Sequence, residues 1–344
     1  MPSRPDVTVA EFGEKRLISE IVRPLVEKTG SGKSTLDDCA TISIEKGSLF
    51  VTTDKIPEDL VAWRKGLMTL KQLGRYLVEV NASDICSMGI EPTQLLVNIA
   101  IPRDYLVRDF EQIYEGLSDR CIELGICIVG GDTKFASNLS MVGVALGQGS
   151  SPGLNRWGAN LGDLLFVSGA VGGFGAALRL LIEDKWNSPG LSSYETEQLK
   201  NLISEPQCEI GLVEKLRSSG IVSSCMDISD GFGQSLIELS QASSVGLKVD
   251  LEKVPTDPYV KSAADVLGCS MSDIILGPGL DLKLLGTVSN SSRSLELCDR
   301  LGLSVIGEVT KGHIELRMDD MPMLHQRIQG YDQLSDDLFS SLKT

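Results

Sequence analysis

Histidine is almost absent from this chain, because its 344 residues include only His313 and His325, both near the C-terminus. A histidine general base is therefore disfavoured, and we expect aspartate or water to carry out any proton transfer. The eight cysteines include no Cys-x-x-Cys pair, and most have apolar neighbours. Buried free thiols are therefore favoured over a zinc site or a disulfide framework.

Basic residues are also scarce. The chain has 32 Lys and Arg against 47 Asp and Glu, and its pI is about 4.7. Nucleic acids and anionic membranes bind clustered Lys and Arg, so we expect neither as a partner. No apolar run of about 18 residues and no N-terminal signal region is recognised. We therefore expect a cytoplasmic protein without a membrane span.

Acidic residues stand beside Gly, Ser, Thr or Asn in five short segments: Asp37-Asp38, Thr52-Thr53-Asp54, Asn81-Ala82-Ser83-Asp84, Gly130-Gly131-Asp132-Thr133 and Asp227-Ile228-Ser229-Asp230-Gly231. Acids that meet in one place repel each other, and they stay ionised together only when divalent cations neutralise them. Mg²⁺ prefers oxygen ligands and bridges to substrate phosphates. The segments therefore predict a Mg²⁺-loaded nucleotide site.

The length favours two domains. A stretch rich in Gly, Ser, Pro and Asn at 149–162 predicts a boundary between a domain of residues 1–150 and one of residues 151–344. Strands alternate with helices in both parts, which predicts an α/β (α+β) fold. Helices are expected over 11–28 and 67–88, a hairpin over 38–53, and a short strand over 126–129 that ends at the Gly130-Gly131 pair.

Two of the motifs allow a second interpretation. Gly32-Lys33-Ser34 suggests a Walker phosphate loop, but Glu27 stands where that pattern needs Gly, and a strand is expected after the loop in place of a helix. A flap over the nucleotide and an ordinary solvated turn both remain open. Ser229 or Asp230 could cap the helix that follows, a role compatible with phosphate binding at the helix N-terminus.

In this order the acidic segments, with Met88-Gly89, Arg156-Trp157-Gly158-Ala159, Gly162-Asp163 and Gly330-Tyr331-Asp332, resemble the thiamine-monophosphate kinase family. That family is related to aminoimidazole ribonucleotide synthetase. The resemblance implies a two-domain fold whose N-terminal and C-terminal α/β halves form a groove for nucleotide. It also implies a homodimer formed through the N-terminal sheets.

The resemblance further implies roles for individual residues in an enzyme that uses ATP and Mg²⁺. The implied Mg²⁺ ligands are Asp38, Thr53, Asp54, Asp84, Asp132, Asp227 and Asp230, of which Asp84 and Asp227 are taken as catalytic. The implied nucleotide-binding residues are Arg156 and Ser229, with Gly131, Thr133 and Asn81. Several cations would spread the charge of the triphosphate and hold the donor and the acceptor in line.

The acceptor side departs from the family pattern. Val61 stands where the family carries His, and the family's acceptor-contacting Glu falls on Leu280 or, in another register, on Gly279. We therefore expect Mg²⁺-dependent phosphoryl transfer from ATP to thiamine phosphate or to another small molecule. ATP activation of a carbonyl or amide oxygen followed by attack of nitrogen is the second hypothesis. A nucleotide-binding partner subunit without turnover is the third.

Overall fold

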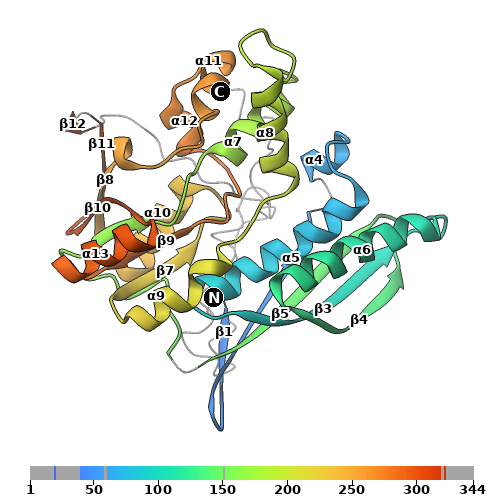
Figure 1. Cartoon of the computed structure of the whole chain (residues 1–344), viewed down its shortest axis with the longest axis horizontal. Helices are drawn as coiled ribbons and strands as arrows, with labels where there is room; N and C mark the ends of the chain where they lie inside the picture. The colour runs from blue at the N-terminus through green and yellow to red at the C-terminus, as the bar shows by residue number, and fades with distance from the viewer. Residues whose placement is uncertain (1–18, 21–38, 58–59, 150–151, 319–320, 323–344) are drawn as a thin grey trace, which may run out of the picture.

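The computed structural model describes residues 19–20, 39–57, 60–149, 152–318 and 321–322, which form two α/β halves lying side by side (Figure 1). The first half contains a five-stranded sheet with the order β1 (Ala40–Ile44), β2 (Gly47–Lys55), β5 (Ser140–Gly149), β3 (Pro92–Ile101) and β4 (Cys127–Phe135). Only β3 and β4 pair in parallel. Its described helices are α4 (Val61–Arg64), α5 (Leu70–Ser87) and α6 (Val107–Leu124).

The second half contains a seven-stranded sheet with the order β12 (Met321–Pro322), β11 (Ile314–Met318), β8 (Gly246–Asp250), β10 (Ser304–Thr310), β6 (Leu164–Val167), β9 (Leu284–Val288) and β7 (Val222–Asp227). Its described helices are α7 (Gly173–Ile182), α8 (Ser193–Ser204), η3 (Ile210–Leu212), α9 (Val213–Ser219), α10 (Phe232–Ser243), η4 (Leu251–Lys253), α11 (Val260–Leu267), α12 (Met271–Ile275) and α13 (Ser292–Leu301). The expected α/β fold with two halves is confirmed.

Several expected elements are present, and one is longer than predicted. The hairpin forms as β1 and β2, and the helix expected over 67–88 is α5. The prediction that a strand ends at Gly130-Gly131 is wrong, because β4 continues to pair with β3 as far as Phe135. The helix expected over 11–28 and the Gly32-Lys33-Ser34 loop lie outside the described residues.

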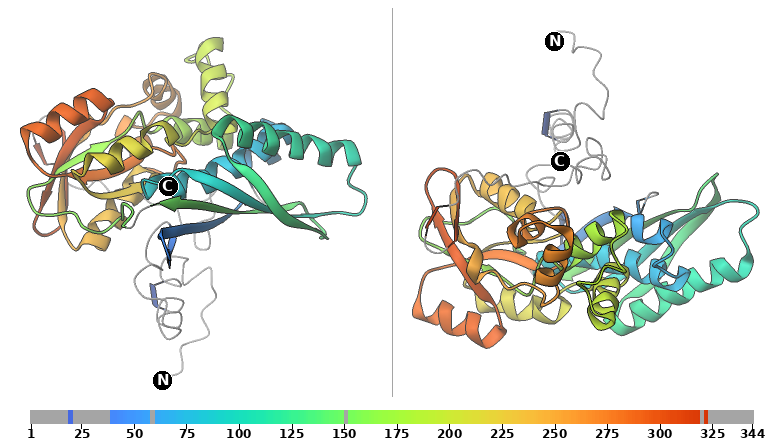
Figure 2. Two further views of the ribbon diagram at one scale, coloured as in Figure 1. Left: turned by 60° about the horizontal axis from the view of Figure 1, so that its bottom comes forward. Right: turned by 90° about the horizontal axis from the view of Figure 1, so that it is seen from above.

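Helix α5 connects the two halves. It begins with a capping box in which the Thr69 side chain accepts from the N–H of Gln72 and the Gln72 side chain accepts from the N–H of Thr69. Helices α5 and α6 cover one face of the first sheet (Figure 2). The two helices approach each other closely at Gly116, where the absence of a side chain is required because a Cβ would overlap the carbonyl oxygen of Lys71. Residues of α5 from Tyr76 to Ser87 are buried except Asp84, as expected for a helix with a core on both sides.

The same helix also anchors the segment that follows α8. Gln72 Nε2 donates to Glu205 Oε1 at 3.0 Å, and the N–H of Cys208 donates to Glu79 Oε2 at 2.8 Å. Glu79 is buried and also forms an ion pair with Arg120 of α6. One side of α5 therefore holds part of the second half directly against the first.

One edge of the second sheet brings three loops together. Strands β6 and β7 are both antiparallel to β9, so they run parallel to each other and end at the same edge. Beyond β7, the N–H of Ile228 donates to Lys283 O at 2.8 Å, and the N–H of Leu282 donates to Ile228 O at 2.9 Å. The acidic segment that starts at Asp227 therefore lies beside the 277–283 segment, at an edge where α/β proteins commonly bind ligands.

Candidate active site at the junction of the halves

The acidic motifs of the two halves meet where α5 reaches the end of β7. Ser83 Oγ donates to Asp227 Oδ2 at 2.6 Å, and the two residues are 1% and 2% exposed. The other carboxylate oxygen, Oδ1, accepts from Ser229 Oγ at 3.2 Å. The predicted convergence of the segments at Asn81–Asp84 and Asp227–Gly231 is therefore present in the structure.

The same turn of α5 also contacts β2. Thr52 Oγ1 donates to Asp84 Oδ2 at 2.5 Å, and the N–H of Asp54 donates to Asn81 Oδ1 at 3.1 Å. Asn81 is fully buried, and its amide nitrogen donates to Leu77 O. Asn81 thus holds the strand at Asp54, while the side chain of Asp84 is fixed by a hydroxyl group.

Thr53 and Asp132 have different surroundings. Because side chains alternate along a strand, Thr53 lies on the opposite face of β2 from Thr52, and its hydroxyl donates to Gly143 O at 2.8 Å. Asp132 is exposed and pairs with Lys134 at 3.3 Å. The metal-binding roles of Thr53 and Asp132 stay predictions, as does that of Asp38, which lies outside the described residues.

Two glycine-motif residues expected to bind nucleotide lie on β4. A Cβ at Gly131 would overlap the carbonyl oxygen of Val97 on β3, so strand packing alone requires glycine there. Thr133 follows in the same strand and is exposed. Their nucleotide-binding roles also stay predictions.

Arg156 and Asp230 both lie beside α10, the helix that follows the acidic segment of the second half. Arg156 Nη1 contacts Glu238 Oε2 of α10 at 3.2 Å, and both side chains are about four-fifths buried, at 20% and 18% exposed. Asp230 is half-buried at the turn into α10, where a Cβ on the next residue, Gly231, would contact the backbone of the 277–279 segment. The phosphate and metal roles of these two side chains are not tested by these contacts.

The donor set at the junction fits Mg²⁺ in kind. Asp84 and Asp227 offer carboxylate oxygens, each oxygen has a second lone pair, and the neighbouring side chains are hydroxyls rather than thiols or imidazoles. Within the part of the chain that is described, no three acidic, His or Cys side chains are close enough to hold a metal ion by themselves. Phosphate oxygens and water complete the shell of most protein-bound Mg²⁺.

A cavity of about 730 Å³ opens at the same edge of the second sheet. Leu280, Phe174 and Tyr259 form apolar parts of its wall, and Asn201 and Gln207 form polar parts. Leu280 belongs to the 277–283 segment, whose backbone pairs with Ile228, the residue after Asp227, so one segment of the chain contacts both the cavity and the acidic motif. Leu280 was predicted from sequence to contact the substrate, and the structure places it in this wall.

Carboxylates gather on one side of this cavity. The N–H groups of Gly172 and Phe174, at the start of α7, donate to Asp281 at 3.1 and 3.4 Å. Burial raises the pKa of Asp281 to about 6, although those hydrogen bonds oppose the shift. Burial also raises the pKa of Asp257. Lys283 Nζ pairs with Glu209 at 2.7 Å. The acids of the wall and its surroundings outnumber the one lysine.

Val61 lies outside this wall. It is the first residue of α4, is 8% exposed, and belongs to the same apolar cluster as Phe174. Helix α4 packs against α7. The predicted substrate contact of Val61 therefore stays a prediction, whereas its burial shows that an apolar residue is accommodated there.

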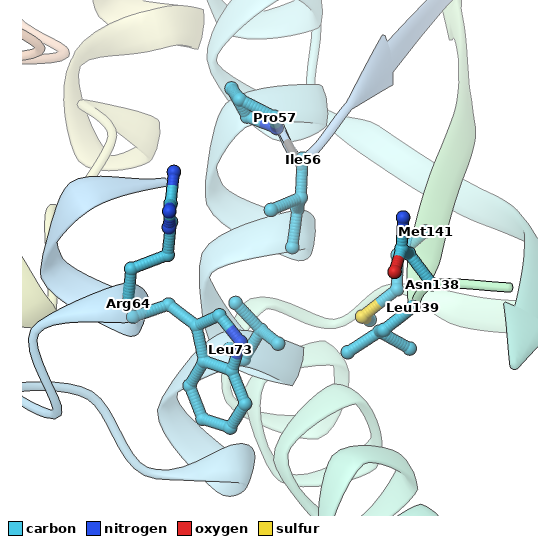
Figure 3. Close-up of a pocket in the computed structure, with 8 residues that line it drawn as sticks. Ile56, Pro57, Arg64, Leu73, Asn138, Leu139 and Met141 are labelled. Atoms are coloured by element: carbon cyan, nitrogen blue, oxygen red, sulfur yellow. The ribbon is translucent and has the colours of Figure 1, made fainter. Parts of the chain in front are cut away.

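A second cavity, of about 520 Å³, lies in the first half between α4, the start of α5 and the segment that joins β4 to β5 (Figure 3). Ile56, Leu73 and Met141 surround it together with Arg64 and Asn138. Among the described residues that line it there is no carboxylate and no member of an acidic motif, so these residues do not make a metal site.

Sequence reasoning missed several of these residues. Ser83 was part of a motif but received no role, and Thr52 was passed over in favour of Thr53. The acids Asp257 and Asp281 received no role either. Side chains alternate along a strand, so Phe50, Thr52 and Asp54 share one face of β2 and Thr53 lies on the other. Because Phe50 is apolar, the alternation indicates that the face with Thr52 is the buried one, as the structure shows. Nothing in the sequence indicated the partner of Ser83.

Two family models match the chain: the N-terminal domain of AIR synthase related proteins over residues 36–148, and the C-terminal domain over residues 160–319. The chain is 30% identical to a thiamine-monophosphate kinase of Corynebacterium glutamicum, over 90% of this chain and 89% of that protein. It is 27% identical to the enzyme of the same name from Pyrococcus horikoshii, over 92% of this chain and 98% of that protein. A solved structure described as AaThiL complexed with AMPPCP and TMP has a TM-score of 0.81 and 25% identity, and the match covers 96% of this chain and 100% of that one.

Proposed function

The chain belongs to the thiamine-monophosphate kinase family of AIR synthase related proteins and is an ATP-dependent phosphotransferase, and from this premise we propose that it transfers a phosphoryl group from Mg-ATP to a small molecule held in the cavity beside Leu280. Thiamine phosphate is the first candidate acceptor, because the relatives carry that name and a related structure holds a nucleotide analogue and TMP.

The observation that carries the proposal is the hydrogen bond between Ser83 and Asp227. It brings the acidic motif of the first half against the acidic motif of the second, at the edge where the cavity opens. A site made this way has a metal-binding part and an acceptor part next to each other. In-line phosphoryl transfer needs that adjacency and needs no nucleophilic side chain.

Asp84 and Asp227 are the residues that would hold Mg²⁺. Asp54, whose N–H donates to Asn81, and Asp230, three positions after Asp227, are further candidates, and Asp38 lies outside the described residues. Bound Mg²⁺ supplies charge neutralisation for the phosphates. The protein's own part is to fix the carboxylates, which Thr52, Ser83 and Ser229 do by hydrogen bonds. By the family resemblance, Arg156 would supply a planar donor to a phosphate oxygen.

The cavity favours an acceptor that carries a positive charge. Asp257 and Asp281 line it, and its one lysine is already paired with Glu209. These carboxylates offset the absence of the family's glutamate at Leu280. A thiazolium ring therefore remains compatible with this wall, in contact with the apolar side chains of Leu280 and Phe174.

Mass spectrometry of the products tests this function. The protein is incubated with Mg-ATP and thiamine phosphate beside two variants: Asp227→Asn at the site, and Asp265→Asn, an exposed aspartate on α11. We expect thiamine diphosphate from the parent and from Asp265→Asn, and none from Asp227→Asn. ADP and free phosphate without a phosphorylated product would favour activation of a carbonyl or amide oxygen. ATP binding without turnover of any acceptor would favour the partner-subunit hypothesis.

The assembly and location complete the proposal. Apolar side chains of β1, β3 and β4 are exposed, namely Ile42, Ile44, Leu96, Ile128, Val129 and Phe135. A second copy of the chain would bury them, and we propose a homodimer through this sheet. Within the described residues, no helix is both long and apolar enough to span a membrane. The cytoplasmic location expected from the sequence stays a prediction.

A further inference from the structure

The hydroxyl group of Ser83 is buried between the two halves and has one acceptor in the described structure. Helix α5 is covered by the first sheet on one side and by the second half on the other, so Ser83 is 1% exposed. Its Oγ donates to Asp227 Oδ2 across 144 positions of sequence, at 2.6 Å. A donor in such a place is normally satisfied, and here it is satisfied by a carboxylate.

This contact fixes the plane of the Asp227 carboxylate. Oδ2 accepts from Ser83 and Oδ1 accepts from Ser229, so both oxygens are held from the protein side. Ser229 is exposed and follows Asp227 in the same loop, whereas Ser83 is buried and belongs to the other half. Ser83 is therefore the more rigid of the two hydroxyl donors.

Two adjacent residues of α5, Ser83 and Asp84, connect the acidic motifs of the two halves. Asp84 is held by Thr52 of β2, and Ser83 holds Asp227 of β7. Because consecutive helical residues have fixed directions, the orientation of Asp84 relative to Asp227 depends on this pair of contacts. Loss of the Ser83 hydroxyl would leave the Thr52–Asp84 contact in place and remove the hydrogen bond to Asp227 Oδ2.

We propose that Ser83 is a positioning residue for Mg-ATP: its hydroxyl orients the Asp227 carboxylate and so sets the geometry of the acidic site across the two halves. The inference rests on the proposed function for the identity of the nucleotide site. It goes beyond that function by assigning a role to a buried side chain that acts through the carboxylate of Asp227.

The alternative is that Ser83 only stabilises the contact between the halves. Ser224 is a matched control, because it is also 1% exposed, lies on β7, and its hydroxyl is 2.8 Å from Thr287 Oγ1 away from the acidic motif. Ser83→Ala and Ser224→Ala each remove a buried hydroxyl. Ser83→Cys keeps the side-chain volume but donates only weakly, and Ser83→Thr keeps the hydroxyl.

The test measures the affinity for Mg-ATP by calorimetry and the midpoint of thermal unfolding without ligand. Loss of a residue that orients a metal ligand commonly weakens metal binding by about 10- to 100-fold. We expect a loss of that size in Ser83→Ala and Ser83→Cys, recovery in Ser83→Thr, and an affinity within about threefold of the parent in Ser224→Ala. The cysteine variant carries the test if the alanine variant does not fold.

Two results would overturn the role of Ser83: Mg-ATP affinity unchanged in both Ser83→Ala and Ser83→Cys, or the same loss in Ser224→Ala as in the Ser83 variants. The binding measurement does not need an acceptor. If the parent binds Mg-ATP but phosphorylates no acceptor, the proposed function fails while the role of Ser83 is still decided.

Discussion

Replacing Asp281 by asparagine tests the electrostatics of the acceptor cavity. Burial raises the pKa of this carboxyl from 3.8 to about 6; the N–H groups of Gly172 and Phe174 and the charge of Lys283 lower it, whereas the nearby Asp257 raises it. The folded protein therefore binds the proton of Asp281 more tightly than the unfolded chain does.

The sign of the effect follows from that difference. Protonated Asp281 favours the folded state, so its contribution is fully present below the unfolded pKa of 3.8 and is lost as the pH rises through about 6. One unit of pKa shift corresponds to about 1.4 kcal/mol, so the shift corresponds to about 3 kcal/mol. Asparagine stays neutral at every pH and keeps one oxygen that can accept from the N–H of Gly172 or of Phe174, so the loss of the second acceptor adds only an offset that does not change with pH.

We expect the free energy of unfolding of Asp281→Asn, relative to the parent, to increase by about 3 kcal/mol between about pH 3 and about pH 7. Urea unfolding across this range measures it, with Asp265→Asn as the control at an exposed aspartate. A difference between Asp281→Asn and the parent that stays constant with pH would refute the reasoning, because it would mean that the carboxyl titrates alike in the folded and unfolded states.

Three further predictions concern the cavity, the contact between the halves and the assembly. Leu280→Glu adds a carboxylate to the cavity wall, so we expect KM for thiamine phosphate to fall about tenfold, with Leu280→Gln as the uncharged control in the same kinetic assay. Glu79→Gln neutralises a buried carboxylate that pairs with Arg120 and accepts from the N–H of Cys208 in the second half, and urea unfolding should show a loss of about 2–3 kcal/mol, against less than about 1 kcal/mol for the exposed partner in Glu123→Gln. Leu96→Glu on β3 should convert a dimer to a monomer in light scattering, whereas Leu295→Glu on α13 should not; a dimer that persists in both would place the interface elsewhere.

The fold was accessible from the sequence because the motifs are local. The hairpin before Asp54 and the helix that carries Asn81 and Asp84 each follow from periodicity within a single segment. The extent of β4 did not follow in this way. A pair of glycines signals a turn when read alone, yet Gly131 is needed because a neighbouring strand passes close to it.

The site was accessible only in outline. Strand alternation separates Thr52 from Thr53, but choosing which of them faces α5 requires the position of the helix. The partner of Ser83 lies 144 positions away and in the other half, so no local pattern contains it. Burial raises the pKa of Asp281, against the opposing hydrogen bonds from the start of α7, and both contributions depend on tertiary packing.

The anchoring of the segment after α8 has a consequence for how an acceptor enters. Glu205 and Gln207 line the cavity, while Gln72 and Glu79 hold Glu205 and Cys208 against the first half. That side of the cavity is therefore built before any ligand arrives, and binding does not have to spend free energy on closing the two halves together. The affinity for the acceptor is then determined by the fit of its shape and charge to a preformed wall, and we expect the structure with acceptor bound to keep the contacts of Gln72 and Glu79 unchanged.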